Sequence, residues 1–258
     1  MQTPAATADA EVTVLKHEPS TTVERVGHGS DAVVRKTYRV LGLRWAQSLW
    51  RPSRAQREHD HLAAIAAAGV PCLRPVRWSA VRRGGGYASS TLETRFLPDS
   101  MPLKQVLQQP PGTTSWRVRA RLAEAMGALV ARLHRAGFLW CTPMPRNALV
   151  HGDPAAARLV VCDTPACVQT NGNLHGGRLA RIDLFLGAFS PSRRRDWSAP
   201  ERLRWLLGYC AGDRAAARTL WRTLARRRPW QNELMRALAM ASLTYVAGWL
   251  RLRPRRGG

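Results

Sequence analysis

The hydrophobic pattern of this chain changes once along its length, and that change restricts the folds it can adopt. In the first region, short runs of β-branched residues alternate with turn residues. This pattern predicts strands at 11–16, 22–26, 32–40, 72–81 and 87–97. One helix interrupts them from 52 to about 68, with Ser53 as its cap and Gly69 after its end. We therefore expect a strand-rich region over 1–98 with one long helix.

The second region, 99–258, is mainly helical in pattern. A long helix is predicted at 115–136, because its apolar residues recur at helical spacing as Leu122, Met126, Leu129, Val130 and Leu133. A short helix is expected at 102–108, and helices from 199 onward. Short strands are expected at 148–150, 158–162 and 178–184, with a polar loop at 169–177. The fold class predicted is α+β, with a β-rich lobe followed by a helical lobe.

The charge of the chain is strongly unbalanced. Forty Lys and Arg residues stand against 17 Asp and Glu, a formal net charge of +23, and the lysines are Lys16, Lys36 and Lys104. A GC-rich genome can account for many arginines but does not explain why acidic residues are few. Such an excess of positive charge favours polyanionic partners. These are an anionic membrane surface, a phosphorylated glycolipid or nucleic acid.

Cysteine usage and the two termini carry weaker signals. The five cysteines form no C-x-x-C pair, which favours reduced thiols. Residues 1–12 lack the pattern of a signal peptide. The apolar window 234–250 contains Arg236 and is short for a membrane span, so we expect a buried helix. The basic run 251–256 suits an anionic surface or a solvated tail.

The stretch 133–150 has the spacing of a kinase catalytic loop, L-H-x-x-G-x-x-H-R-D-x-x-P-x-N-x-L-V. Its second half is intact, but Trp140, Cys141 and Thr142 stand where His-Arg-Asp is expected. The aspartate of such a loop orients and deprotonates the acceptor hydroxyl. Thr142 therefore marks a degenerate base position.

Lys36 and Glu58 are candidates for a functional ion pair. Strand alternation places Lys36 on one face with Val34 and Tyr38. Glu58 lies on the apolar face of its helix, where an unpaired carboxylate would be costly, so it needs a cation. Lys36 is one partner and Arg54, four residues earlier, is the alternative. Ahead of Lys36, Gly27 and Gly29 form a turn that is either a phosphate-covering loop or an ordinary hairpin turn.

Asn147 and Asp183 are the metal candidates. Each offers a hard oxygen ligand suited to Mg²⁺, and Asp183 ends an apolar run that we expect to be a strand. Singly, Asn147 can be a turn former and Asp183 a cap. Their occurrence with the Pro145-x-Asn147-x-Leu149-Val150 pattern is more specific.

Two further clusters look chemical and are assigned structural roles. His151-Gly152-Asp153 copies the catalytic triplet of aminoglycoside-type phosphotransferases, but its metal asparagine would fall on Arg158, so we expect a turn. The run 58–61, Glu-His-Asp-His, has a metal-like composition. Consecutive helical residues point around the helix, so they cannot converge on one ion, and no structural metal is expected.

Several segments together resemble a known family. They are 33–39, 51–58, 62–71, 145–147 and 181–184. The chain resembles the lipopolysaccharide kinase family, which contains Kdo kinases and core heptose kinases and has a protein-kinase-like two-lobe fold. The resemblance implies ATP- and Mg²⁺-dependent transfer to a sugar hydroxyl of lipid A-core, in the cytoplasm at the periphery of the inner membrane.

By matching position, the resemblance also implies residue roles. Lys36 would hold phosphates with Glu58 bracing it, Asn147 and Asp183 would hold metal, and 93–96, with Glu93 and Arg95, would lie near adenine. The partner would be an anionic glycolipid, and no nucleic-acid motif is present.

The family's catalytic aspartate maps to Thr142, and 151–177 reads as an insertion between the loop and the metal aspartate. Two functions remain open: a weakened glycolipid kinase, or a pseudokinase that binds nucleotide or glycolipid and regulates or scaffolds envelope assembly.

Overall fold

A computed structural model describes residues 11–110, 112–164, 166–190 and 196–225. The chain divides into two compact units. Unit 1 comprises residues 1–63 and 73–97, and unit 2 comprises 64–72 and 98–258. The first unit is therefore close to the strand-rich region of the sequence, but the last residues of its helix and those that follow, 64–72, group with unit 2.

Unit 1 contains a five-stranded antiparallel sheet with the order β1-β2-β3-β5-β4. Its strands are β1 (Val12–Glu18), β2 (Thr21–Val26), β3 (Val33–Arg39), β4 (Pro75–Arg83) and β5 (Gly86–Arg95). The β-branched runs predicted all five. A short helix, α1 (Leu43–Gln47), follows β3 and was not predicted.

Helix α2 (Arg54–Ala67) has the ends that its sequence predicts. Ser53 Oγ accepts a hydrogen bond from the backbone N–H of Gln56 at 3.1 Å, which satisfies a helix-end donor. Gly69 follows with φ +71°, a conformation that glycine adopts without strain. The helix buries Ala55, Leu62 and Ile65, all without exposed surface.

Unit 2 is built on its helices. They are α3 (Leu103–Leu107), α4 (Trp116–Arg135), α5 (Ala180–Leu184), α6 (Ala199–Tyr209) and α7 (Arg214–Ala225). The predicted apolar stripe of α4 is buried in the core. Residues 180–184 are helical and continue into a π-helical turn, Phe185–Phe189, so the prediction of a strand at 178–184 is wrong.

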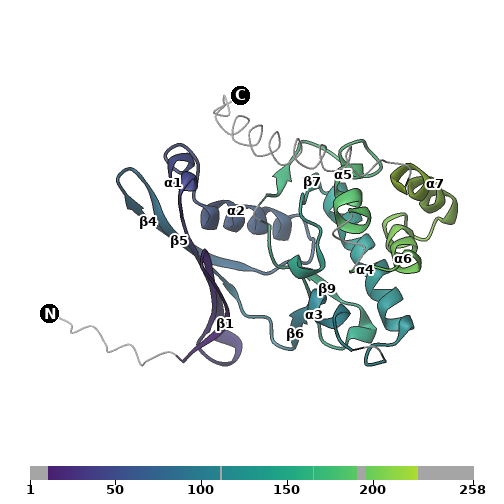
Figure 1. Cartoon of the computed structure of the whole chain (residues 1–258), viewed down its shortest axis with the longest axis horizontal. Coiled ribbons are helices and arrows are strands. Elements are labelled where there is room, and N and C mark those ends of the chain that lie inside the picture. The colour runs from purple at the N-terminus through teal and green to yellow at the C-terminus, as the bar shows by residue number, and fades with distance from the viewer. Residues whose placement is uncertain (1–10, 111, 165, 191–195, 226–258) are drawn as a thin grey trace. The chain divides into compact units, whose positions relative to one another are not determined.

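Glycines let α4 and α6 approach closely in unit 2 (Figure 1). A Cβ added at Gly127 of α4 would overlap the carbonyl oxygen of Trp205, and one at Gly208 of α6 would overlap that of Glu124. The helix backbones are therefore in direct contact, and any larger residue at these positions must separate them.

Two small sheets complete unit 2. In one, β6 (Ser100–Pro102), β8 (Ala148–His151) and β9 (Leu159–Val161) pair antiparallel, and in the other β7 (Phe138–Leu139) pairs with β10 (Val168–Gln169). The predicted strands at 148–150 and 158–162 are confirmed. Residues 151–177, which are expected to be an insertion, supply a hairpin turn and the strands β9 and β10.

The apolar window 234–250 and the basic run 251–256 lie outside the described residues. Within the described ranges, none of the helices combines the length and apolar character required to cross a bilayer.

Candidate phosphotransfer site

The Lys36–Glu58 pair expected from the sequence is present in unit 1. Lys36 Nζ donates to Glu58 Oε1 at 2.8 Å, joining β3 to α2. Glu58 has no exposed surface and the Lys36 side chain is nearly buried. Tyr38, on the same strand face, donates its hydroxyl to Glu58 Oε2 at 2.5 Å. The carboxylate therefore receives a charge-assisted bond on each oxygen, as a buried anion requires.

Arg54 does not take the place of Lys36 in this pair. Its guanidinium lies over the ring of Tyr38, 4.2 Å from the centroid, as a cation–π contact. Arg54 therefore packs against the tyrosine that binds Glu58. The ion pair fixes the Lys36 ammonium on one face of the sheet.

The glycine turn between β2 and β3 is explained by backbone conformation. Gly27 and Gly29 have φ of +84° and +59°, a region that other residues rarely adopt. Nothing lies within 4 Å of a Cβ added at Gly29, so strain and not crowding favours glycine there. The positive φ angles that the turn requires are enough to explain both glycines. A phosphate-covering role stays a prediction.

Glu93 and Arg95 do not share a sheet face with Lys36. On the β3–β5 ladder Lys36 is opposite Leu92, and Arg35 is opposite Glu93. Facing residues of a ladder point to the same side, so Glu93 and Arg95 point to the other side from Lys36. The expected place of 93–96 near adenine concerns the segment and not the side-chain face, so it stays a prediction.

The Glu93 carboxylate is held by two arginines of neighbouring strands. Arg77 Nε donates to Oε2 at 2.6 Å, and Arg35 Nε donates to Oε1 at 2.9 Å. The hydrogen bond from Arg77, assisted by Arg35, holds the pKa of Glu93 below its usual value although burial opposes the shift. This cluster ties β4, β5 and β3 together.

Asp183 organises the loop of unit 2 that carries Thr142. Its carboxylate accepts the backbone N–H of Trp140 at 2.6 Å and that of Cys141 at 2.7 Å. Cys141 has φ +62°, a conformation that costs a non-glycine residue energy. Asp183 thus holds a strained turn in place immediately before Thr142.

A chain of buried hydrogen bonds extends behind Asp183. His134 Nε2 lies 3.1 Å from Asp183 Oδ2, and His134 Nδ1 lies 3.0 Å from the hydroxyl of Tyr209. That hydroxyl accepts the backbone N–H of Gly176 at 3.1 Å. Because the carboxylate can only accept, we assign the imidazole proton to Nε2 and the Tyr209 proton to the bond with Nδ1. Burial raises the pKa of Tyr209 to about 12, so the hydroxyl stays protonated.

These contacts exclude Asp183 as the metal ligand that the sequence suggested. Both carboxylate oxygens accept bonds from protein donors, and the residue has no exposed surface. It also lies in a helix and not at the end of a strand. Asp183 is therefore a structural support of the loop.

Thr142 and Asn147 lie together in that loop. The amide nitrogen of Asn147 donates to the backbone carbonyl of Thr142 at 2.8 Å. The amide oxygen is consequently the atom that Asn147 can offer to a metal. Thr142 is 9% exposed, and its Oγ1 is buried without a hydrogen-bond partner in the part of the chain that the structure describes. The neighbouring thiol cannot act as a base, since burial beside Asp183 raises the pKa of Cys141.

Sequence reasoning missed Asp163, which directly follows the residue hydrogen-bonded to the Asn147 backbone. Asp163 follows β9 by two residues and is half-buried. The backbone N–H of Cys162 donates to the Asn147 carbonyl at 3.0 Å, and the indole N–H of Trp140 donates to the Asp163 carbonyl at 2.9 Å. The available signal was an aspartate directly after the second strand of the hairpin that Asn147 begins.

The segments 151–153 and 58–61, which were expected to be structural, make local contacts. The segment 151–153 forms the end of β8 and its turn, and Asp153 Oδ1 accepts the backbone N–H of Ala155. The predicted turn is confirmed. In the run 58–61 the Glu58 carboxylate is bound to Lys36 and Tyr38. Across the described ranges, no three His, Cys, Asp or Glu side chains gather in a metal-binding group.

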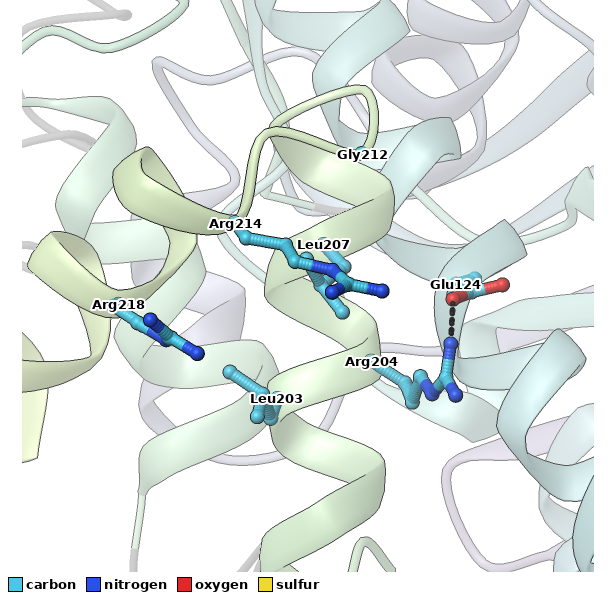
Figure 2. Close-up of a pocket in the computed structure, with 7 residues that line it drawn as sticks. All are labelled: Glu124, Leu203, Arg204, Leu207, Gly212, Arg214 and Arg218. Carbon is cyan, nitrogen blue, oxygen red and sulfur yellow. Dashed lines mark hydrogen bonds and ion pairs between the residues drawn. The ribbon is translucent and has the colours of Figure 1, made fainter.

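A separate hollow of about 420 Å³ lies among α4, α6 and α7 (Figure 2). Leu203 and Leu207 form its apolar wall, and Arg204 reaches Glu124 at 2.9 Å. Arg214 and Arg218 extend toward it from α7. None of the predicted site residues lines this hollow.

Comparison with known proteins identifies the family of the chain. Residues 25–171, more than half of the chain, match the sequence model of the Lipopolysaccharide kinase (Kdo/WaaP) family. The match includes Asn147 and Asp163 and ends before Asp183. Curated protein sequences gave no match.

Among solved structures, "WaaP in complex with acyl carrier protein" is similar with a TM-score of 0.56 and 17% sequence identity. The similarity covers 91% of this chain and 89% of that one. At this identity the likeness shows the fold, which is kinase-like and α+β. With the family match over 25–171, the chain belongs to the Lipopolysaccharide kinase (Kdo/WaaP) family.

Proposed function

We propose that this protein transfers the γ-phosphoryl group of ATP to a sugar hydroxyl of lipid A-core, at a rate limited by Thr142. The observation that carries the proposal is the buried Lys36–Glu58 pair, in a chain whose family is a kinase family. In the reaction the bond between Pγ and the β,γ-bridging oxygen breaks. A bond from the acceptor oxygen to Pγ forms, and the acceptor proton leaves to solvent.

In unit 1, Lys36 is proposed to bind nucleotide phosphates. An ammonium held at 2.8 Å by a buried carboxylate is fixed in position. Glu58 and Tyr38 act through it as positioning residues. Gly27 and Gly29 are proposed to bring backbone N–H groups close to the phosphates, as their turn conformation allows.

In unit 2, Asn147 and Asp163 are proposed to hold Mg²⁺. The fit rests on one neutral amide oxygen and one half-buried carboxylate, on neighbouring backbone segments joined by the Cys162–Asn147 bond. Bound Mg²⁺ would neutralise charge on the transferred phosphoryl group. The chain's own part is to orient the Asn147 amide through the Thr142 carbonyl and to fix the backbone of Asp163 through the Trp140 indole.

Thr142 sets the expected rate. A hydroxyl cannot accept a proton at neutral pH, but its buried Oγ1 can bond to an acceptor hydroxyl and orient it. Loss of a general base commonly costs ~10²–10⁴-fold. In a largely dissociative transition state much of the catalysis comes from positioning and charge, which leaves measurable turnover.

The proposed partner is the anionic glycolipid, at the cytoplasmic face of the inner membrane. The net charge of +23 supports an anionic substrate and surface. Nucleic acid is not proposed, because its only support is the same charge.

Thr142 also supports a second candidate, a pseudokinase that binds nucleotide or glycolipid without turnover. The two candidates differ in one experiment. Purified protein is incubated with γ-labelled ATP, Mg²⁺ and lipid A-core, and label in the lipid is measured for wild type, Asp163→Asn and Thr142→Asp. Slow wild-type transfer that is lost in Asp163→Asn supports the kinase. No transfer by wild type, with Mg-ATP binding retained, supports the pseudokinase.

A further inference from the structure

Unit 1 exposes a group of large apolar side chains in one short segment. They lie on and around α1 and are Leu41, Trp45, Leu49 and Trp50, of which Leu41 is 55% and Trp50 68% exposed. Isolated exposed apolar residues are ordinary, but four within ten residues form a patch that needs an explanation. We name these four residues, with Arg82 and Arg83 of the adjoining turn, the α1 platform.

Hydrogen bonds anchor the α1 platform to the β4–β5 hairpin. Figure 1 shows α1 beside the tip of the β4–β5 hairpin. The indole N–H of Trp45 donates to the Arg83 carbonyl at 3.1 Å. Ser48 Oγ accepts the backbone N–H of Tyr87 at 2.8 Å and donates to the Trp45 carbonyl at 2.6 Å. These bonds fix the segment 45–48 on the hairpin.

The turn residues allow this close packing. A Cβ added at Gly86 would lie 2.8 Å from both Ser48 Oγ and Trp45 Nε1, and one at Gly85 would lie 3.4 Å from a methyl of Leu49. The glycine run 84–86 therefore has a packing reason, and the apolar side chains remain exposed although their backbone is anchored.

The sequence stretches that form the platform carry charge of one sign. The sequence has no acidic residue between Asp31 and Glu58, and none between Asp60 and Glu93. Arg39, Arg82 and Arg83 are exposed in these intervals. The Arg82 guanidinium is fixed by the Gly85 carbonyl at 2.8 Å and the Tyr87 hydroxyl at 2.9 Å. These stretches therefore present arginines and no carboxylate of their own to an anionic surface.

We propose that the α1 platform docks the protein on an anionic phospholipid surface, with Trp45, Leu49 and Trp50 in the interfacial layer. Tryptophan favours the boundary between head groups and acyl chains, and arginine binds lipid phosphates. A second copy of the chain fits less well, because it would bring the same arginines into contact with these. The inference rests on the proposed work at a membrane and names the surface that performs the docking.

Vesicle sedimentation tests the platform without nucleotide or turnover, so its outcome is separate from that of the proposed kinase activity. Wild type is compared on phosphatidylcholine vesicles with and without phosphatidylglycerol. Trp50→Ala and Arg83→Ala remove exposed platform groups. Trp116→Ala and Arg117→Ala are matched controls, because Trp116 is 48% exposed and Arg117 is exposed at the start of α4 in unit 2. Thermal melting confirms that all four variants fold.

Wild type should bind the anionic vesicles. Arg83→Ala should weaken binding about fivefold, the effect of one basic residue near an anionic surface, and Trp50→Ala by ~5–10-fold. The controls should bind like wild type. Absence of wild-type binding, or equal losses in both pairs of variants, would contradict the proposal. So would a platform variant that changes the oligomeric state in light scattering while vesicle binding stays intact.

Discussion

Replacing Asp183 by Asn separates a structural aspartate from a metal-binding one. The change keeps the shape of the side chain but leaves one acceptor oxygen in place of two. If the amide oxygen keeps the bonds of Oδ2 to Trp140 and His134, the new NH₂ group faces the N–H of Cys141. If the amide is flipped, the bonds to Trp140 and His134 are lost instead.

The expected cost follows from these contacts. A buried N–H left without an acceptor costs ~1–3 kcal/mol, and the remaining bonds lose their charge assistance. Asp183→Asn should therefore lower the free energy of unfolding by ~2–4 kcal/mol, which is a large share of the stability of a protein this size. Asp183→Ala should cost at least as much, because the N–H groups of Trp140 and Cys141 both lose their partner.

The assay is urea unfolding of wild type, Asp183→Asn and Asp163→Asn, followed by melting with and without Mg-ATP. Asp163→Asn is the matched control, since it makes the same chemical change at a half-buried position after β9. It should change stability little but remove the Mg-dependent stabilisation by ATP, which reports binding to the folded state. The reasoning is refuted if Asp183→Asn keeps wild-type stability and alone abolishes the Mg-ATP effect.

Three further changes test other parts of the account. Glu58→Gln should lower the free energy of unfolding by ~3 kcal/mol, because it breaks a buried ion pair, and urea unfolding measures this. Arg77→Ala should raise the pKa of Glu93. The lowered pKa in wild type stabilises the fold above the unfolded-state pKa of about 4.3, and this stabilisation is lost as the pH falls. The difference in melting temperature between wild type and the variant should therefore be smaller at pH 3 than at pH 7. A constant difference would contradict this. Gly127→Ala should cost ~1–3 kcal/mol or more, since its Cβ meets the Trp205 carbonyl, and an unchanged melting temperature would show that α4 and α6 are less closely packed.

Local sequence signals predicted much of the fold because they act over short distances. The strands of unit 1 follow from β-branched runs, and α2 follows from Ser53 and Gly69. The need of Glu58 for a cation followed from a physical necessity, since a carboxylate on an apolar helix face must be paired, and the structure chose Lys36 over Arg54. Such inferences need no knowledge of distant contacts.

The assignment of Asp183 as a metal ligand was wrong because tertiary contacts decide the role of this residue. Asp183 and Asp163 both follow apolar runs, and sequence alone did not distinguish a helix at 180–184 from a strand. What separates them is that two backbone N–H groups of a distant loop bind Asp183. The ladder register also places Lys36 and Glu93 on opposite faces of the sheet, a relation on which the sequence prediction made no statement.

The most direct test of the central claim is transfer of labelled phosphate from ATP to lipid A-core by wild type and Thr142→Asp. The account predicts slow transfer by wild type and a rise of ~10²-fold or more when the general base is supplied. Asp163→Asn should abolish transfer in both backgrounds. Wild type that binds Mg-ATP but transfers no phosphate, with no gain in Thr142→Asp, would contradict the claim that this chain is a kinase.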